Sequence, residues 1–168
     1  YRLLEPALHL PESVRICCKE NDLNTLLGDL VLHKLDLVIS DSAIPPDINI
    51  HCFSHPLGES DLTFFATPQL TDTLKKDFPG CLNNAPFLLP GNATGIRVQL
   101  QQWFDKLHIH PCIVGEFDDS ALMKEFGQAG VGIFAAPSAI KTELEKKHAV
   151  IPIGRAQNLI IRFYAISV

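Results

Sequence analysis

The sequence has little that would attract nucleic acid or a membrane. Its 168 residues carry 14 Lys and Arg against 19 Asp and Glu, which gives a formal net charge of −5. Phosphate backbones are held by clustered cations, and the only adjacent pairs here, Lys75-Lys76 and Lys146-Lys147, have acidic neighbours. No apolar run approaches the roughly 18 residues that a membrane-spanning helix needs. We therefore expect no membrane contact, and any contact with DNA to be made by another part of a longer molecule.

Motifs of the common enzyme classes are also missing. The chain has no G-x-S-x-G nucleophile elbow, no phosphate-binding P-loop and no dinucleotide fingerprint. Its five cysteines form an odd set in a chain long enough to fold without disulfides, so we predict reduced thiols in a cytoplasmic protein. The run His108-x-His110-x-Cys112 lacks the ligand spacings typical of zinc sites. We predict that the protein is not an enzyme and has no catalytic residues, cofactor or metal site.

What the sequence does contain is an alternation of helix and strand patterns. Hydrophobic residues make up 46%, enough for a sizeable core. Asp22 caps a predicted helix, a short apolar strand follows at 36–40, and the same order recurs after residue 67. This alternation favours an open, mostly parallel sheet with helices on both faces. The predicted helices span 2–9, 23–35, 68–77, 96–107, 120–128 and 138–147, and the predicted strands span 14–19, 36–40, 61–67, 87–89, 109–114, 133–136, 150–153 and 159–168.

The restart of the alternation divides the chain into two lobes. The last predicted strand, 159–168, has the length and composition to lie beside the strand at 62–67. Two such strands would connect the lobes as a hinge and leave a cleft between them. We expect lobe I to comprise residues 1–64 and 160–168, and lobe II to comprise residues 65–159.

Two segments resemble motifs of LysR-type transcription regulators. Residues 30–39 (LVLHKLDLVI) resemble the "L…G.LDLAI" segment of their effector-binding domains, with Lys34 where glycine is usual. Residues 128–137 (QAGVGIFAAP) resemble the "V..G.GI..LP" signature, with alanine in place of leucine. The resemblance implies an α/β fold of two Rossmann-like lobes joined by two hinge strands, similar to type-2 periplasmic binding proteins.

Four further segments resemble the branch of this family whose members activate sodium/proton-antiporter genes: residues 2–8, 87–91, 114–124 and 163–167. The resemblance implies an effector-sensing regulatory domain that responds to Na⁺ or alkaline pH and works as a homodimer or tetramer. The family's first strand of lobe I would precede Tyr1, so we expect lobe I to be incomplete. Its winged helix-turn-helix would lie further upstream, and DNA would be bound only through that part.

A periplasmic-type solute-binding protein is the alternative, because such proteins share the two-lobe cleft. The absence of a secretion signal, the short length and the odd cysteine count speak against it. A helix-turn-helix encoded upstream would favour the regulator, and a signal peptide there would favour the solute-binding protein.

Three loops are candidates for effector binding. In open parallel sheets, ligands bind outside the carboxyl ends of strands, near helix N-termini. This rule selects the loop after the strand at 36–40 and the loops before the helices at 96–107 and 120–128. The candidate residues are Ser40, Asp41, Ser42, Gly91, Asn92, Thr94, Glu116, Phe117 and Asp118.

The polar residues of these loops have two interpretations. Asp41, Glu116 and Asp118 would supply part of an oxygen shell for a hard cation such as Na⁺. Alternatively, Asp118 or Asp119 caps the helix that follows, and Thr94 caps its own helix. The sequence leaves both interpretations open.

Overall fold

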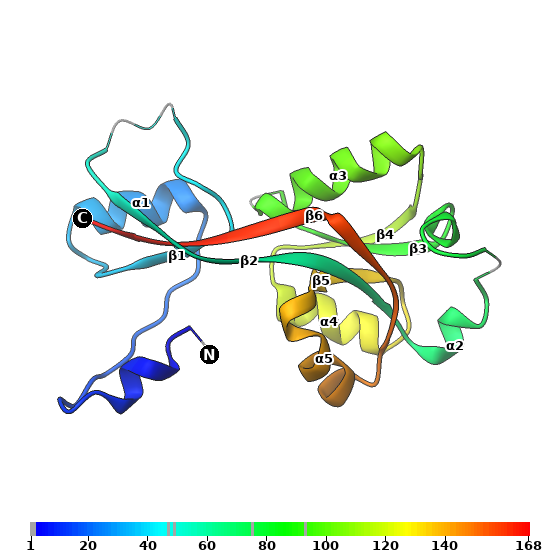
Figure 1. Cartoon of the computed structure of the whole chain (residues 1–168), viewed down its shortest axis with the longest axis horizontal. Helices are drawn as coiled ribbons and strands as arrows, with labels where there is room; N and C mark the ends of the chain where they lie inside the picture. The colour runs from blue at the N-terminus through cyan, green and yellow to red at the C-terminus, as the bar shows by residue number, and fades with distance from the viewer. Residues whose placement is uncertain (1–2, 47, 49, 75, 93) are drawn as a thin grey trace.

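Two long strands run through the whole molecule and connect two lobes (Figure 1). The structure, a computed structural model, describes residues 3–46, 48, 50–74, 76–92 and 94–168. The long strands are β2 (Phe53–Ala66) and β6 (Ile151–Ser167), and they pair antiparallel along their length. The mixed α/β fold of two lobes joined by two hinge strands is the one predicted from the sequence.

Lobe I is built on one end of these hinge strands. It contains the 3₁₀ turn η1 (Glu5–His9), helix α1 (Leu23–Val31) and the short strand β1 (Val38–Ser40). β1 pairs antiparallel with β6, which corrects the expectation of a parallel strand at this place. Its core is small and consists of Leu27, Leu30, Val38 and Ile166, with partly buried neighbours around them.

Lobe II holds the remaining elements. Strand β3 (Pro86–Pro90) pairs parallel with β4 (Cys112–Phe117), and a parallel bridge from Phe87 to Ile133 joins β3 to the chain just before β5 (Phe134–Pro137). β5 pairs antiparallel with β2, so the parallel part of the sheet ends at the hinge. The helical segments are α2 (Pro68–Thr71), η2 (Gly80–Leu82), α3 (Gly95–Leu107), α4 (Ser120–Gln128), η3 (Ser138–Ile140) and α5 (Lys141–His148).

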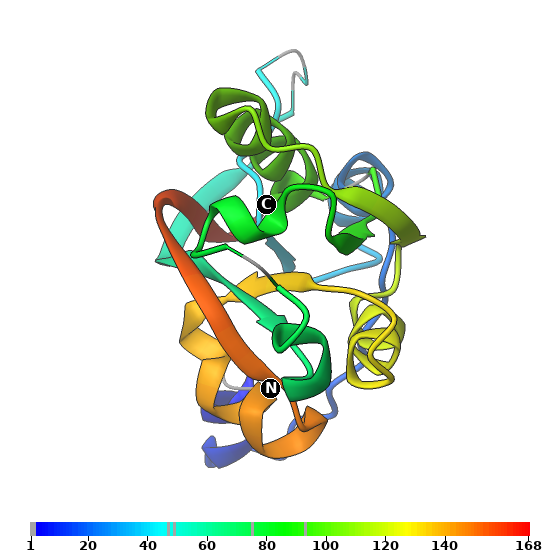
Figure 2. The ribbon, with the colours of Figure 1, turned by 90° about the vertical axis from the view of Figure 1, so that its right-hand side faces the viewer.

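The helices of lobe II cover both faces of its strands. α3 lies on one side, and α4 and α5 lie on the other (Figure 2). Because side chains alternate along a strand, β2 contributes to two cores. Phe64 packs in the cluster that contains Leu100 and Phe104 of α3. Phe65 packs in the cluster that contains Met123 of α4 and Leu144 of α5.

The hinge strands pair in a register different from the predicted one. Leu62 to Ala66 lie opposite the first half of β6, from Ala156 back to Ile151. The predicted last strand, 159–168, instead pairs with the part of β2 that precedes Leu62. The predicted strands at 150–153 and 159–168 are therefore one continuous strand that serves both lobes.

Several predicted elements differ in length or are not formed. Residues 14–19 form no strand, and all of residues 10–20 are exposed. The helix predicted to reach residue 35 ends at Val31, where the N–H of Leu32 bonds back to Gly28 and His33 takes a left-handed φ of 55°. The strand predicted at 109–114 lies at 112–117. Within the described ranges, no helix is long and apolar enough to cross a membrane.

Candidate functional site

The three predicted loops lie where the two lobes meet. Gly95, the first residue of α3, approaches lobe I so closely that a Cβ atom there would collide with the hydroxyl of Ser42. The same Cβ would lie 3.1 Å from the backbone oxygen of Asp41. The loop after β1 therefore rests on the N-terminus of α3, and this contact requires glycine on the lobe II side.

The second contact joins the two lobe II loops. A Cβ atom on Gly91 would collide with the carboxylate of Asp118, so these residues are also in direct contact. Arg97 of α3 links the same loops, because its Nη1 donates to the carbonyl of Pro90 and pairs with Glu116 Oε2 at 3.0 and 3.1 Å. The structure thus brings all three predicted loops together around the start of α3.

Most polar groups of these loops already have partners within the protein. Ser40 Oγ accepts from the N–H of Ser42 at 3.0 Å, and Ser42 Oγ donates to Asp41 Oδ1 at 3.2 Å. Thr94 caps α3: its hydroxyl donates to the carbonyl of Gly91 and accepts from the N–H of Arg97. These bonds favour the structural role proposed for the Thr94 side chain.

The carboxylates of the acidic loop before α4 have different partners. Asp119, not Asp118, caps α4, because its Oδ1 accepts from the N–H groups of Ala121 and Leu122. Glu116 is held by Arg97, and Phe117 packs against Phe126. Across the residues that the structure describes, no three His, Cys, Asp or Glu side chains gather closely enough to hold a metal ion. Asp41, Glu116 and Asp118 are therefore not gathered into one such group, and their part in an oxygen shell completed by carbonyls and water stays a prediction.

Asn92 is exposed to solvent. The residues of the run His108-x-His110-x-Cys112 do not all belong to one element. His108 is the left-handed C-cap of α3, and only Cys112 of that run belongs to β4. His108 and His110 therefore lie outside the strand, because β4 begins at Cys112, three residues later than the strand predicted at 109–114.

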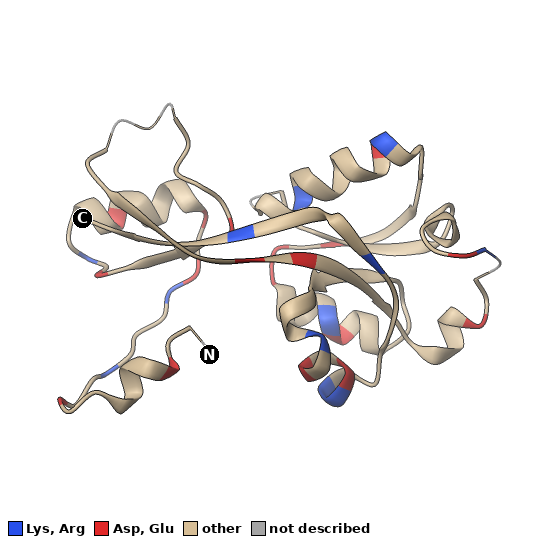
Figure 3. Ribbon diagram, viewed as in Figure 1, with Lys and Arg blue, Asp and Glu red and all other residues tan. Residues whose placement is uncertain are grey.

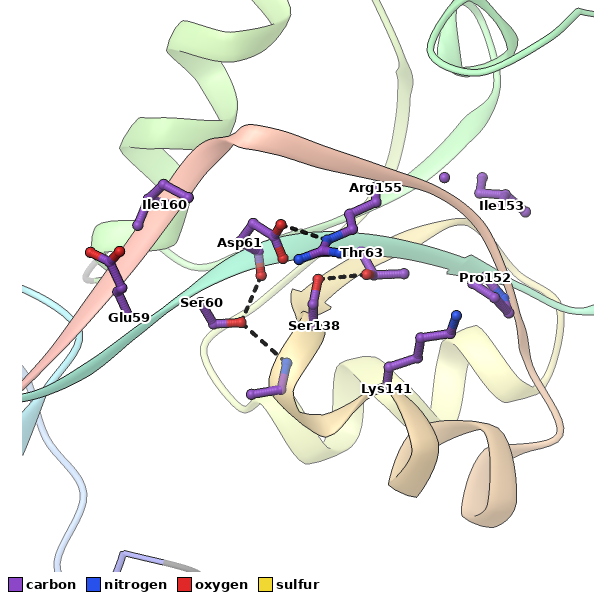
Figure 4. Close-up of a pocket in the computed structure, with 12 residues that line it drawn as sticks. Glu59, Ser60, Asp61, Thr63, Ser138, Lys141, Pro152, Ile153, Arg155 and Ile160 are labelled. Carbon is purple, nitrogen blue, oxygen red and sulfur yellow. Dashed lines mark hydrogen bonds and ion pairs between the residues drawn. The ribbon is translucent and has the colours of Figure 1, made fainter.

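A cavity lies beside the hinge strands β2 and β6 (Figure 4). This hinge pocket has a volume of about 710 Å³. Segments of β2 and β6 form one wall, and the turn η3 with the start of α5 forms the other. The residues that line it are Glu59, Ser60, Asp61, Thr63, Ser138, Ala139, Lys141, Pro152, Ile153, Gly154, Arg155 and Ile160.

Asp61 is the most unusual residue of the hinge pocket. Its side chain is only 7% exposed, and its Oδ2 accepts from Arg155 Nε at 2.5 Å. Its Oδ1 is buried without a hydrogen-bond partner among the described residues. Burial raises the pKa of Asp61, but the nearby hydroxyl of Ser138 and the bond and charge of Arg155 outweigh it and leave the pKa below its usual value. The Asp61 carboxylate is therefore ionised.

Hydroxyl groups connect the two walls of the hinge pocket. Thr63 Oγ1 on β2 and Ser138 Oγ on η3 share a hydrogen bond of 2.6 Å. Ser60 Oγ donates to the carbonyl of Asp61 at 2.9 Å and accepts from the N–H of Ala139 at 3.1 Å. These bonds fix η3 against the hinge strand β2.

Sequence reasoning missed this pocket although one signal for it was present. Ser138 follows strand β5 at the same edge where Gly91 follows β3 and Asp118 follows β4, so the rule that selected the other loops also applies to it. The sequence indicates a pocket position for Asp61 less clearly, because a single acidic residue at the start of a strand is equally compatible with a solvent-exposed position.

The chain has two α/β lobes joined by two hinge strands, with loops and a pocket at the hinge. This is the architecture of a ligand-responsive two-lobe domain. The chain belongs to the family of LysR substrate-binding domains, whose model matches residues 3–167. It is 34% identical over 164 residues to the transcriptional activator protein NhaR of Escherichia coli K12, and equally to that of Shigella flexneri. These matches cover 98% of this chain but 54% of the relatives, so the chain spans about half the length of the curated relatives it matches.

Solved structures of regulatory domains share the fold. The CcmR regulatory domain of Synechocystis PCC6803, solved with 2-PG, matches with a TM-score of 0.75 and 17% identity over 99% of this chain and 80% of that one. The apo regulatory domain of HypT from Salmonella typhimurium matches with a TM-score of 0.74 and 16% identity over 99% and 79%. The effector-binding domain of QuiR, solved with shikimate, matches with a TM-score of 0.68 and 17% identity over 88% and 69%.

Proposed function

We propose that this chain is the effector-sensing part of a cytoplasmic transcriptional activator that controls a sodium/proton-antiporter gene in response to Na⁺ or alkaline pH. The observation that carries the proposal is the 34% identity to the activator NhaR along almost the whole chain. Residues 1–64 with 160–168 would form lobe I, and residues 65–159 would form lobe II. The chain would act as a homodimer or tetramer, and DNA would be bound by a separate helix-turn-helix.

The geometry at the hinge supports a sensing role. A ligand shifts a conformational equilibrium only if it binds one state better than the other. Here the loop that carries Asp41 touches Gly95 across the lobe boundary, whereas the loop that carries Asp118 touches Gly91 within lobe II. The hinge pocket lies between β2 and η3. A change in the angle between the lobes would alter both places together, so binding at either one would favour one lobe angle.

The distribution of charge supports a separate DNA-binding part. Lys and Arg are spread over both lobes and interleaved with Asp and Glu (Figure 3). The formal net charge of −5 is opposite in sign to the basic surface that phosphate backbones require.

A chimeric activator tests the proposed function. We would replace the matching region of the Escherichia coli activator with this chain and measure transcription from a promoter that the activator controls. Added NaCl, or a shift to alkaline pH, should raise transcription several-fold, while KCl at the same concentration should not. KCl is the control for ionic strength, which acts on all exposed charges alike.

The outcomes separate the parts of the proposal. Equal responses to NaCl and KCl, without any response to pH, would show that sodium or pH is not the signal. A chimera that fails to activate under every condition, although it is folded and binds the promoter, would contradict the regulatory role itself.

A further inference from the structure

We infer that the hinge pocket binds a small zwitterion of the α-amino acid type, with its ammonium group toward Asp61 and its carboxylate toward Lys141 and Arg155. The inference goes beyond the proposed function, because it assigns the hinge pocket a ligand of its own, separate from the response to Na⁺ or pH. The observations that support it are the charges, the hydrogen-bonding groups and the apolar lining of the pocket.

Charges of both signs line the hinge pocket. Glu59 and Asp61 come from β2, whereas Lys141 begins α5 and Arg155 lies on β6. In the close-up, Glu59 and Lys141 lie toward opposite ends of the pocket, with Asp61 and Arg155 between them (Figure 4). Two carboxylates and two cations leave the lining electrically balanced, so a ligand that carries one charge of each sign matches it.

Asp61 supplies the acceptor for an ammonium group. Its carboxylate lines the pocket, its side chain is 7% exposed, and its Oδ1 lacks a donor among the described residues. A buried carboxylate oxygen is stabilised when a ligand supplies the missing donor, most strongly when that donor is charged.

Lys141 and Arg155 supply donors for a carboxylate group. Lys141 is exposed at the pocket wall and makes no ion pair with any residue that the structure describes. Arg155 uses its Nε on Asp61. The fork of its guanidinium therefore has terminal N–H groups to offer an anion, in the geometry that carboxylates prefer.

Ions of a single sign fit this lining less well. A metal cation near Asp61 would also lie near Arg155, which is bonded to the same carboxylate. A simple anion near Lys141 or Arg155 would face the carboxylates of Asp61 and Glu59. Pro152, Ile153 and Ile160 provide apolar lining, which suits a short aliphatic substituent on the ligand.

Calorimetric titration of the 168-residue chain with each of the twenty common amino acids tests the inference. At least one of them should bind, while acetate and methylamine, which each carry only one of the two charges, should bind at least tenfold more weakly. The variants Lys141→Gln and Asp61→Asn should each weaken the binding about tenfold or more, which corresponds to about 1.4 kcal/mol. Lys146→Gln, on the same helix but outside the pocket, should bind as the parent does.

Several results would overturn the inference. These are the absence of binding by every amino acid, equal binding of acetate or methylamine, or undiminished binding by Lys141→Gln. Circular dichroism checks that the Asp61→Asn variant is folded. If that variant is not folded, the binding measured with Lys141→Gln, which changes only an exposed side chain, tests the inference alone. None of these results would change the expected response of the chimeric activator to Na⁺ or pH. The inference about the hinge pocket and the proposed function can therefore be refuted independently.

Discussion

Two helical glycines in this chain have opposite surroundings. Gly28 in α1 has nothing within 4 Å of the position that a Cβ would occupy. At Gly95 the same atom would collide with Ser42 and approach the backbone of Asp41. Glycine in a helix is entropically unfavourable. At position 95 the close approach of Ser42 and Asp41 explains why glycine is present, whereas at position 28 no neighbouring atom requires it.

Alanine at these two positions should therefore have effects of opposite sign. Gly28→Ala should stabilise the chain by about 0.5–1 kcal/mol, because it lowers the entropy of the unfolded state and meets no neighbour. Gly95→Ala should destabilise it by about 1–3 kcal/mol, because the loop after β1 must move away from α3. Urea unfolding measures both free energies.

Small-angle scattering of the Gly95→Ala variant adds a second measure. The radius of gyration should increase if the loop at Asp41 and Ser42 holds the lobes together. An unchanged stability and shape would show that this contact is not important for the lobe arrangement.

Helix α4 shows how much of an element can be predicted from its own residues. Its bounds, Ser120–Gln128, agree with the sequence prediction, because the cap, the apolar spacing and the following glycines are all local signals. The direction of β1 was not predictable in this way, since an apolar run looks the same in a parallel or an antiparallel pair. The unformed strand at 14–19 shows that a strand also needs a partner, and none of the described segments provides one.

The candidate site was predictable to the same extent. The loops at 40–42, 91–94 and 116–118 follow from strand order, and the structure brings them together. The assignment of each carboxylate was not predictable, because Asp118 and Asp119 are adjacent and only the backbone geometry selects Asp119 as the cap. Asp61 and Arg155 are 94 positions apart, so their pairing depends on the register of the hinge strands.

A matched pair of variants at the start of α4 tests this assignment. Asp119→Ala should destabilise the chain by about 1 kcal/mol, because two N–H groups lose their acceptor. Asp118→Ala removes an equal charge one residue earlier and should cost less than half as much. Thermal unfolding of both variants checks the difference, and equal losses would mean that charge alone, and not capping, stabilises α4.

The whole molecule exposes more surface than a compact monomer of its size. Its accessible surface is 10447 Å², whereas about 8,200 Å² is typical for 18.6 kDa. The two-lobe shape accounts for part of the excess. The segment before α1 accounts for more, because residues 8–20 are all exposed and η1 buries no side chain.

Limited trypsin digestion should therefore begin in this segment. Arg15 and Lys19 lie in exposed chain without helix or strand, and we expect the first cuts after them. Because the removed part buries almost nothing, the free energy of unfolding should change by less than about 0.5 kcal/mol. Mass spectrometry identifies the cuts, and first cleavage at Lys141 or Lys146 in α5 would contradict the prediction.

The pairing of β2 with β6 is irregular at three places, and one of them, between Asp61 and Leu62, adjoins the hinge pocket. β-bulges bend a ribbon and increase its local twist. A two-stranded ribbon resists stretching through its hydrogen bonds but yields in torsion. The lobes of this protein should therefore rotate about the ribbon axis more readily than they separate. A ligand bound at the hinge would then change the relative orientation of the two lobes while the distance between them stays nearly constant.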